Sequence, residues 1–375
     1  MTDPTTLISN RNFHRRITLP TPSHGPLTIT YADIGSPTGP TLLFCPGMFA
    51  SRYLGIPLHV LAERAGVRLI VADRPGMGGA TDVSAEERIR AWVEIFPRLL
   101  EHLGVQSVAL ASHSAGTMYL FNAWKSYPNL VEGRAFCLAP WVDPSHSRVT
   151  SMQAASYLPK GLFAYWHSIP RFFVTQASPV LASSGAVMRK MSGSMSSLSG
   201  LSSSKSDSQE ESDKNFLDAN YKRIQRDYGV PVKESEELAK LALKYMFDEE
   251  TVGANGEALV CLRKTKNQGR DWGVCEDYAE CAKTLQNLKG AGVQLEGVEG
   301  NGKVELRAYF AEKDALTGSR GQRYFDECWK IQTQSKEEEG NVKYLGRMVQ
   351  GTDHDTLAQA VEVWEEIFGL VGGRQ

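Results

Sequence analysis

The chain has 375 residues, of which 42% are hydrophobic and 22% are charged, a composition typical of a globular protein. Its 41 basic and 43 acidic residues give a formal net charge of −2, and no basic block stands out, so we exclude nucleic acid as a partner. No apolar run reaches the length of a transmembrane helix and the N-terminus has no apolar signal core, so we expect a cytoplasmic protein without stable membrane insertion.

All six cysteines are predicted to be reduced thiols, because none forms a C-x-x-C pair and no secretory signal accompanies them. No group of histidines and cysteines has the spacing of metal ligands, so the sequence predicts no metal. The glycine-rich run at residues 76–79 lacks the pattern of a phosphate-binding loop and opens no clear helix. We therefore interpret it as a structural turn and expect no cofactor.

The first part of the chain alternates between strand and helix patterns. Residues 16–20 and 27–31 flank a turn at residues 23–26 and alternate as the two arms of a β-hairpin do. Apolar runs and helical periodicity then predict, in chain order, a strand at 41–45, a helix at 54–65, a strand at 67–72, a helix at 84–103, a strand from 108, a helix from 117 and a strand at 134–140.

The helix predicted at residues 84–103 carries the clearest end signals. Ser84 and Glu87 have the spacing of a capping box at its start, and Gly104 ends it. Pro97 falls inside the pattern. We expect a kink or a break there, because proline lacks the N–H group that a helix interior uses.

The alternation breaks near Trp141 and resumes near Trp272. Residues 157–173 are rich in aromatic side chains at nearly helical spacing, which either bury this stretch against the core, line a substrate pocket, do both, or dock on a membrane surface. Residues 192–214 form a Ser-rich and then charged run that buries too little apolar surface to fix its backbone, so we expect disorder there. Two helical patterns follow, at 221–228 and 234–247.

The last third of the chain returns to alternation, with a helix predicted at 275–288, a strand at 304–311, a helix at 322–333, a strand at 342–349 and a helix at 356–370. Strands that alternate with helices imply parallel pairing with right-handed crossovers, and apolar strands imply a sheet covered on both faces. We therefore predict an α/β protein with a mostly parallel sheet, the hairpin being an antiparallel edge. Its core comprises residues 1–142 and 271–375, and residues 143–270 form an inserted, mainly helical cap.

Residues 108–116 combine a buried strand, a sharp turn and the start of a helix around Ser114, the arrangement of a nucleophile elbow. Such a turn strains the backbone of the serine, which requires small neighbours, here Ser112 and Gly116. It also aims the N–H of Ala115 and the first helical turn at the serine oxygen, where negative charge develops in acyl transfer. The first small residue is usually glycine, and the alternative interpretation is a polar turn between a strand and a helix.

A nucleophilic serine needs a histidine base and a carboxylate that orients the histidine. Asp314 directly follows the penultimate predicted strand, and His354 follows the last one. Because the carboxyl ends of parallel strands share one edge of a sheet, we expect Ser114, Asp314 and His354 to converge there. Asp143 and Glu312 remain alternatives for the carboxylate.

The order serine, aspartate, histidine resembles the α/β-hydrolase superfamily. Residues 46–48 (Pro-Gly-Met) lie at the place of that family's His-Gly-x oxyanion loop, with Pro46 where the family usually has histidine, and residues 73–79 are similar to its D-R-P-G-x-G turn. The resemblance covers the chain outside residues 142–271 and implies an α/β-hydrolase fold with an inserted cap. A serine at the elbow argues against epoxide or haloalkane chemistry, for which relatives use an aspartate.

The resemblance also implies a function, namely a serine hydrolase that cleaves an ester or related acyl bond of a small, partly apolar substrate through an acyl-enzyme. It implies Ser114 as the nucleophile, His354 as the base and Asp314 as the orienting acid. The backbone N–H groups of Met48 and Ala115 are the expected oxyanion donors.

Two groups of alternatives stay open at this point. An acyltransferase, a hydrolase of C–C bonds or a lyase would use the same three residues. A non-catalytic ligand-binding or interaction protein would use the same fold without them. The sequence does not indicate an oligomeric state.

Overall fold

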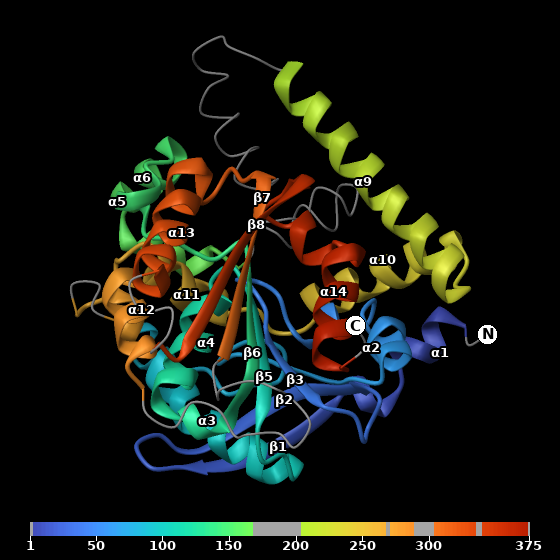
Figure 1. The fold of residues 1–375 in the computed structure, drawn as a ribbon, viewed down its shortest axis with the longest axis horizontal. Coiled ribbons are helices and arrows are strands. Elements are labelled where there is room, and N and C mark those ends of the chain that lie inside the picture. Colours follow the sequence, from blue (N-terminus) through green and yellow to red (C-terminus); the bar gives the residue numbers. More distant parts are fainter. Residues whose placement is uncertain (1–2, 168–203, 268–270, 289–303, 335–339, 374–375) are drawn as a thin grey trace.

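The computed structural model describes residues 3–167, 204–267, 271–288, 304–334 and 340–373. Its centre is one eight-stranded sheet (Figure 1). The strands are β1 (Arg15–Thr21), β2 (Gly25–Gly35), β3 (Thr41–Cys45), β4 (Arg68–Ala72), β5 (Val108–His113), β6 (Val131–Leu138), β7 (Val304–Lys313) and β8 (Val342–Asp353). Their order across the sheet is β1-β2-β4-β3-β5-β6-β7-β8.

The sheet is mostly parallel, as predicted. The β1–β2 hairpin forms the antiparallel edge, and β2 also runs antiparallel to β4. Every pair from β4 through β8 is parallel. The register pairs His113 of β5 with Leu138 of β6, and Lys313 of β7 with Asp353 of β8. His113, Lys313 and Asp353 directly precede the three candidate catalytic residues. Ser114, Asp314 and His354 therefore leave the sheet at the same edge.

Helices cover both faces of the sheet, which explains the nearly continuous apolar strands. On one face, α2 (His59–Ala65) and α14 (Val361–Val371) pack together (Figure 1). The other face carries α3 (Arg88–Leu103), α4 (Gly116–Ser126), α12 (Tyr278–Gln286) and α13 (Gly318–Gln334). Among the described residues, every helix is too short or too polar to cross a bilayer.

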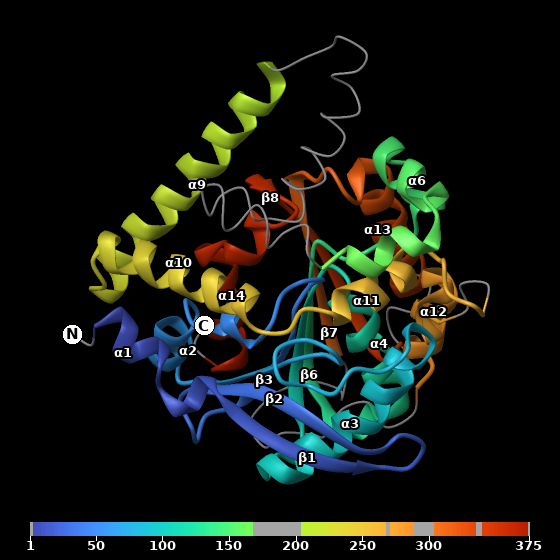
Figure 2. The same cartoon turned by 180° about the vertical axis from the view of Figure 1, so that it is seen from behind.

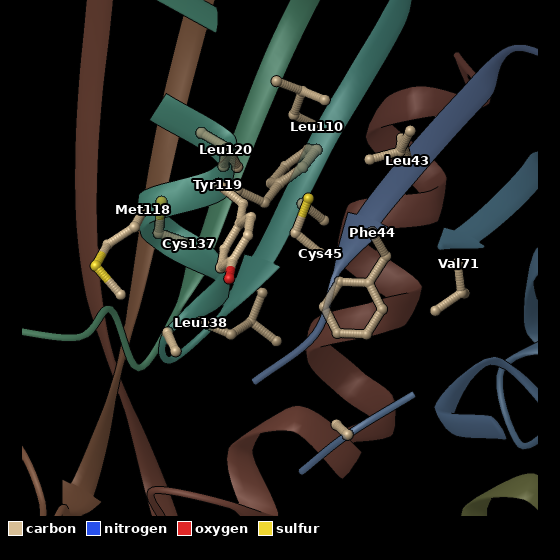
Figure 3. Packing of buried hydrophobic residues seen from close by; sticks show 14 of the residues in the cluster. Leu43, Phe44, Cys45, Val71, Leu110, Met118, Tyr119, Leu120, Cys137 and Leu138 are labelled. Atoms are coloured by element: carbon tan, nitrogen blue, oxygen red, sulfur yellow. The ribbon is translucent and has the colours of Figure 1, made fainter. Parts of the chain in front are cut away.

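The core around the carboxyl ends of the central strands is dense and apolar. Leu43 of β3 and Leu110 of β5 are completely buried, and Phe44 is 1% exposed. Figure 3 shows Leu110 on the side of α4, near Leu120, whereas Phe44 lies on the other face of the sheet, with its ring centroid 4.9 Å from that of Trp364 in α14. Because interiors packed in this way tolerate little displacement, the strand ends form a rigid platform for the residues that follow them.

The helix predicted at 84–103 differs at its start and at its proline. The Ser84 side chain makes no cap hydrogen bond, and residues Ala85–Glu87 form a separate 3₁₀ turn before α3 begins at Arg88. The predicted capping box is therefore wrong. The helix also runs unbroken through Pro97, because its buried face, which includes Phe96 and Leu99, holds it against the core.

Another prediction, the helix at 54–65, corresponds to two shorter elements. A 3₁₀ turn spans Arg52–Gly55, and α2 begins only at His59. Periodicity alone does not reveal this interruption, since the apolar residues on both sides of it face the same core.

A helical insertion follows β6. It contains α5 (Pro144–Ser147), α6 (Thr150–Tyr157), α9 (Ser204–Tyr228), α10 (Val232–Asp248) and α11 (Gly253–Cys261). A short N-terminal helix, α1 (Pro4–Ile8), packs against α10, and α9 projects from the rest of the molecule in both views (Figures 1 and 2).

Part of the run expected to be disordered is helical. Residues 192–203 lie outside the described residues, but residues 204–214 form the first turns of α9, so the expectation is wrong for them. Two features account for the helix. Its glutamate, glutamine and lysine residues have good helix propensity, and its later turns are anchored by buried Ile224 and by Asn220, which accepts a hydrogen bond from Val361 N–H.

Candidate active site

Ser114 lies on the sharp turn between β5 and α4. Its φ angle is +50°, in the left-handed region that residues other than glycine rarely adopt. The turn brings α4 against the end of β3, where a Cβ atom added to Gly116 would lie 2.0 Å from the carbonyl oxygen of Cys45. Position 116 therefore requires glycine. Position 112 accepts a serine, because its buried hydroxyl group donates a hydrogen bond to the carbonyl oxygen of Phe136 at 3.4 Å.

The structure brings Ser114, His354 and Asp314 into one hydrogen-bonded chain. The Ser114 Oγ atom lies 2.8 Å from His354 Nε2, and Asp314 Oδ2 lies 2.8 Å from His354 Nδ1. Ser114 is 6% exposed, His354 1% and Asp314 9%. The chain of contacts is thus shielded from bulk water, which strengthens the electrostatic interactions within it.

The Asp314 carboxylate is fully engaged. While Oδ2 contacts the histidine, Oδ1 accepts hydrogen bonds from the N–H groups of Leu316 at 2.9 Å and Thr317 at 2.7 Å. Burial alone would raise the pKa of Asp314, but His354 and these N–H groups outweigh it and lower that pKa. Asp314 is therefore ionised and held in a fixed orientation.

The two alternative acids are bound to other groups. Asp143 caps α5 through Ser145 N–H at 2.8 Å, and its other carboxylate oxygen accepts a hydrogen bond from Arg263 Nε at 2.8 Å. Glu312 accepts a hydrogen bond from the N–H of Gly351 at 2.8 Å. The carboxylate that contacts His354 Nδ1 is that of Asp314.

His354 is held by a second histidine, His113, which directly precedes the serine in sequence. Burial lowers the pKa of His113 to about 3, so its ring is neutral and its Nε2–H donates to the His354 carbonyl oxygen at 2.8 Å. This bond fixes the backbone of the loop that carries His354. No sequence signal indicates it, because the residue before the serine is variable in the elbow pattern.

Two backbone N–H groups lie on the segments beside the serine. Within the described residues, neither Met48 N–H nor Ala115 N–H donates a hydrogen bond. Ala115 caps the N-terminus of α4, the positive end of the helix dipole. Gly47 packs directly on the elbow, since a Cβ atom added to it would lie 3.1 Å from Ser114 Cβ. The Gly47–Met48 peptide is thus next to the serine.

The described aromatic residues of the stretch at 157–173 divide into two groups. Phe163 and Trp166 are buried and pack on each other with ring centroids 5.4 Å apart, whereas Tyr157 and Tyr165 are 86% and 72% exposed. Phe172 and Phe173 lie outside the described residues. Packing against the core therefore accounts for the buried pair, whereas the exposed pair faces solvent.

No metal centre is evident in the part of the chain that the structure describes. There, no three side chains of histidine, cysteine, aspartate or glutamate are grouped as metal ligands. The acidic and imidazole groups of the site are engaged with one another and with backbone groups instead.

Comparison with known proteins identifies the fold. The family model described as the alpha/beta hydrolase fold matches residues 40–217, a range that contains Ser114 but neither Asp314 nor His354. No curated protein matches the sequence.

Several solved structures share this architecture at low sequence identity. DBJA, in the mutant called dbja delta, has a TM-score of 0.55 and 14% identity, covering 96% of this chain and 99% of that one. Esterase RhEst1 from Rhodococcus sp. ECU1013 has a TM-score of 0.53 and 13% identity, covering 96% and 99%. Epoxide hydrolase A from Mycobacterium thermoresistibile has a TM-score of 0.51 and 14% identity, covering 95% and 98%. These likenesses establish the fold of the chain.

The contact between Gly116 and β3 generates a prediction about stability. The substitution Gly116→Ala should lower the free energy of unfolding by about 1–3 kcal/mol or more, because the new methyl group meets a backbone oxygen that cannot move. Elsewhere alanine is the better helix former. Chemical denaturation followed by circular dichroism measures the effect. Gly161→Ala is the control, since a Cβ atom at Gly161 would have nothing within 4 Å. Equal stability of the two variants would contradict the elbow geometry.

Proposed function

The chain belongs to the α/β-hydrolase superfamily, and on that basis we propose that it is a serine hydrolase that cleaves an ester or related acyl bond. The observation that carries the proposal is the pair of 2.8 Å contacts that runs from the Ser114 hydroxyl through His354 to Asp314. The strained backbone of Ser114 supports it, because such strain is costly and recurs at functional sites.

In the proposed reaction, Ser114 Oγ attacks the carbonyl carbon of the substrate while His354 Nε2 takes the hydroxyl proton. Asp314 holds the proton on Nδ1, which keeps Nε2 free as the base, and it stabilises the imidazolium that forms. The tetrahedral intermediate carries its negative charge on the former carbonyl oxygen. Met48 N–H and Ala115 N–H donate to that oxygen, and one such donor is typically worth about 10²–10³ in rate.

The intermediate then collapses, and His354 gives its proton to the leaving alcohol as the carbon–oxygen bond breaks. The acyl group stays on Ser114 until water attacks it. His354 takes a proton from that water and returns one to Ser114 Oγ, which releases the acid and restores the enzyme. The serine nucleophile disfavours epoxide chemistry, although an epoxide hydrolase shares the fold.

We assign a small, partly apolar acyl substrate to this site, with the helical insertion as its cap. The rings of Trp141 and His354 are nearly perpendicular, with centroids 6.5 Å apart, and the half-buried Met48 lies on the loop beside the serine. Apolar side chains next to the reacting groups favour substrates that bury carbon atoms there. A non-catalytic binding protein on the same fold is the alternative that the following experiment addresses.

Replacing the nucleophile tests the proposal directly. Ser114→Ala should lower kcat for an aryl ester by about 10⁴–10⁶-fold and abolish labelling by a serine-directed fluorophosphonate, with an unchanged melting temperature. The control Ser235→Ala removes the hydroxyl of another buried serine, on α10, and should keep both activity and labelling. A folded wild-type protein that the fluorophosphonate does not label at Ser114 would indicate a binding protein. Product analysis separates hydrolysis from acyl transfer or lyase chemistry.

The pH profile provides a second test. Burial lowers the pKa of His354, but Asp314 outweighs it and raises this pKa to about 9. Because the neutral imidazole is the base, kcat/KM should rise with pH and level off above that value. Asp314→Asn should lower kcat by about 10⁴-fold and move the rise to lower pH, since the carboxylate that raises the pKa is gone. Asp143→Asn is the matched control, and a shift in that variant instead would reassign the acid.

A further inference from the structure

We infer that the helical insertion helps to build the oxyanion hole, with Arg74 and Glu257 as positioning residues: Glu257 of α11 orients Arg74, and Arg74 orients the peptide that presents Met48 N–H. The inference rests on the proposed function, because it assigns to Met48 N–H the stabilisation of the oxyanion. Neither side chain touches the substrate in this scheme. Both act through the backbone of the loop at residues 46–49.

The first link is a hydrogen bond to the loop itself. Arg74 Nη2 donates to the carbonyl oxygen of Gly47 at 2.7 Å, and the N–H of Ala50 donates to the same oxygen at 3.0 Å. The Gly47 carbonyl and Met48 N–H belong to one trans peptide, in which the two bonds point in opposite directions. Holding the carbonyl against Arg74 therefore fixes the N–H on the other side of that peptide plane.

The second link holds the guanidinium in place. Arg74 Nε and Nη2 donate to the two carboxylate oxygens of Glu257 at 2.8 and 2.9 Å, a bidentate pair in which both residues are completely buried. The guanidinium also lies over the Tyr119 ring, 5.5 Å from its centroid. A pair with this planar geometry fixes orientation as well as charge. The remaining freedom of Arg74 is therefore small.

The pKa shifts of Arg74 and Glu257 both favour the charged form of the side chain. Burial raises the pKa of Glu257, but the positive charge and the hydrogen bonds of Arg74 outweigh burial and lower it. Burial likewise lowers the pKa of Arg74, and the Glu257 carboxylate more than compensates by raising it. The Arg74–Glu257 ion pair is therefore not expected to change its charge in the pH range in which His354 titrates.

The third link attaches α11 to the turn that carries Arg74. Gly253 N–H donates to Gly76 O at 2.8 Å, and Gly78 N–H donates to Glu250 O at 2.8 Å. Arg88 bridges the same turn by donating to Pro75 O. Because backbone bonds run in both directions, the start of α11 and residues 74–79 form one rigid unit. The insertion thus reaches the reaction centre through a continuous series of bonds.

The experiment compares Arg74→Lys and Glu257→Gln with the wild-type chain. Lysine keeps the positive charge that Glu257 needs but cannot hold both carboxylate oxygens and the Gly47 carbonyl together. We expect kcat for an aryl ester to fall about 10- to 100-fold with KM changed less than about threefold, because the lost interaction acts in the transition state. Affinity for an arylboronic acid, whose serine adduct mimics the tetrahedral intermediate, should fall by a similar factor.

Arg68→Lys is the matched control. Arg68 makes an equivalent bidentate pair with Asp33, at 2.9 and 2.8 Å, but it lies at the amino end of β4, away from the loop. It should keep the wild-type kcat and boronate affinity. Thermal melting of each variant separates loss of fold from loss of rate, and either folded variant of the Arg74–Glu257 pair decides the question.

The possible outcomes are distinct. Folded variants with wild-type kcat and boronate affinity would overturn the inference and leave the pair a purely structural one. Equal losses of kcat and boronate affinity in Arg68→Lys would also overturn the inference, because they would reflect a general destabilisation of the protein. If the wild-type chain itself is not labelled at Ser114 by the fluorophosphonate, the proposed function fails first, and the inference fails with it.

Discussion

The close approach of α4 to the end of β3 constrains everything else at the candidate site. A Cβ atom added to Gly116 would lie only 2.0 Å from Cys45 O, so position 116 has no room for a side chain, and the elbow and the loop after β3 share one surface. Ser114 accepts a left-handed backbone conformation to make that contact. The same contact sets Gly47 against Ser114, so the nucleophile and the peptide proposed to bind the oxyanion are placed by one packing interaction rather than by two independent ones.

Much of this arrangement could be predicted from the sequence. The hairpin, the strands at 41–45 and 304–311 and the convergence of Ser114, Asp314 and His354 follow from periodicity and from the rule that parallel strands end at one edge. The errors have tertiary causes. Ser84 has the correct spacing for a cap but not the backbone path, and Pro97 is carried by a helix whose packing outweighs one missing hydrogen bond.

What no local pattern reveals are bonds between distant residues. Arg74 and Glu257 are 183 residues apart in sequence, and neither has a neighbour that indicates the other. The sequence pattern at residues 73–79 predicts only a turn. The adjacent Asp73 behaves in the same way: it binds Arg52 Nη1 at 2.6 Å, and Arg52 binds Glu249 of the insertion at 2.6 Å. Residues 73 and 74 thus belong to two separate charge networks that join the insertion to the core: the completely buried Arg74–Glu257 pair, and a chain from Asp73 through Arg52 to the partly exposed Glu249. Loss of one member of the buried pair would leave an uncompensated buried charge, which is very unfavourable.

The position of the insertion between β6 and β7 has a consequence for how such a protein diversifies. Ser114 precedes the insertion and Asp314 and His354 follow it, so this segment can be lengthened or exchanged without removing any member of their hydrogen-bonded chain. The carboxylate of Glu257 limits that freedom. A transplanted segment without an acid at this point would leave the desolvated Arg74 cation in the interior without a partner. Any segment exchanged at this place must therefore supply a carboxylate to Arg74.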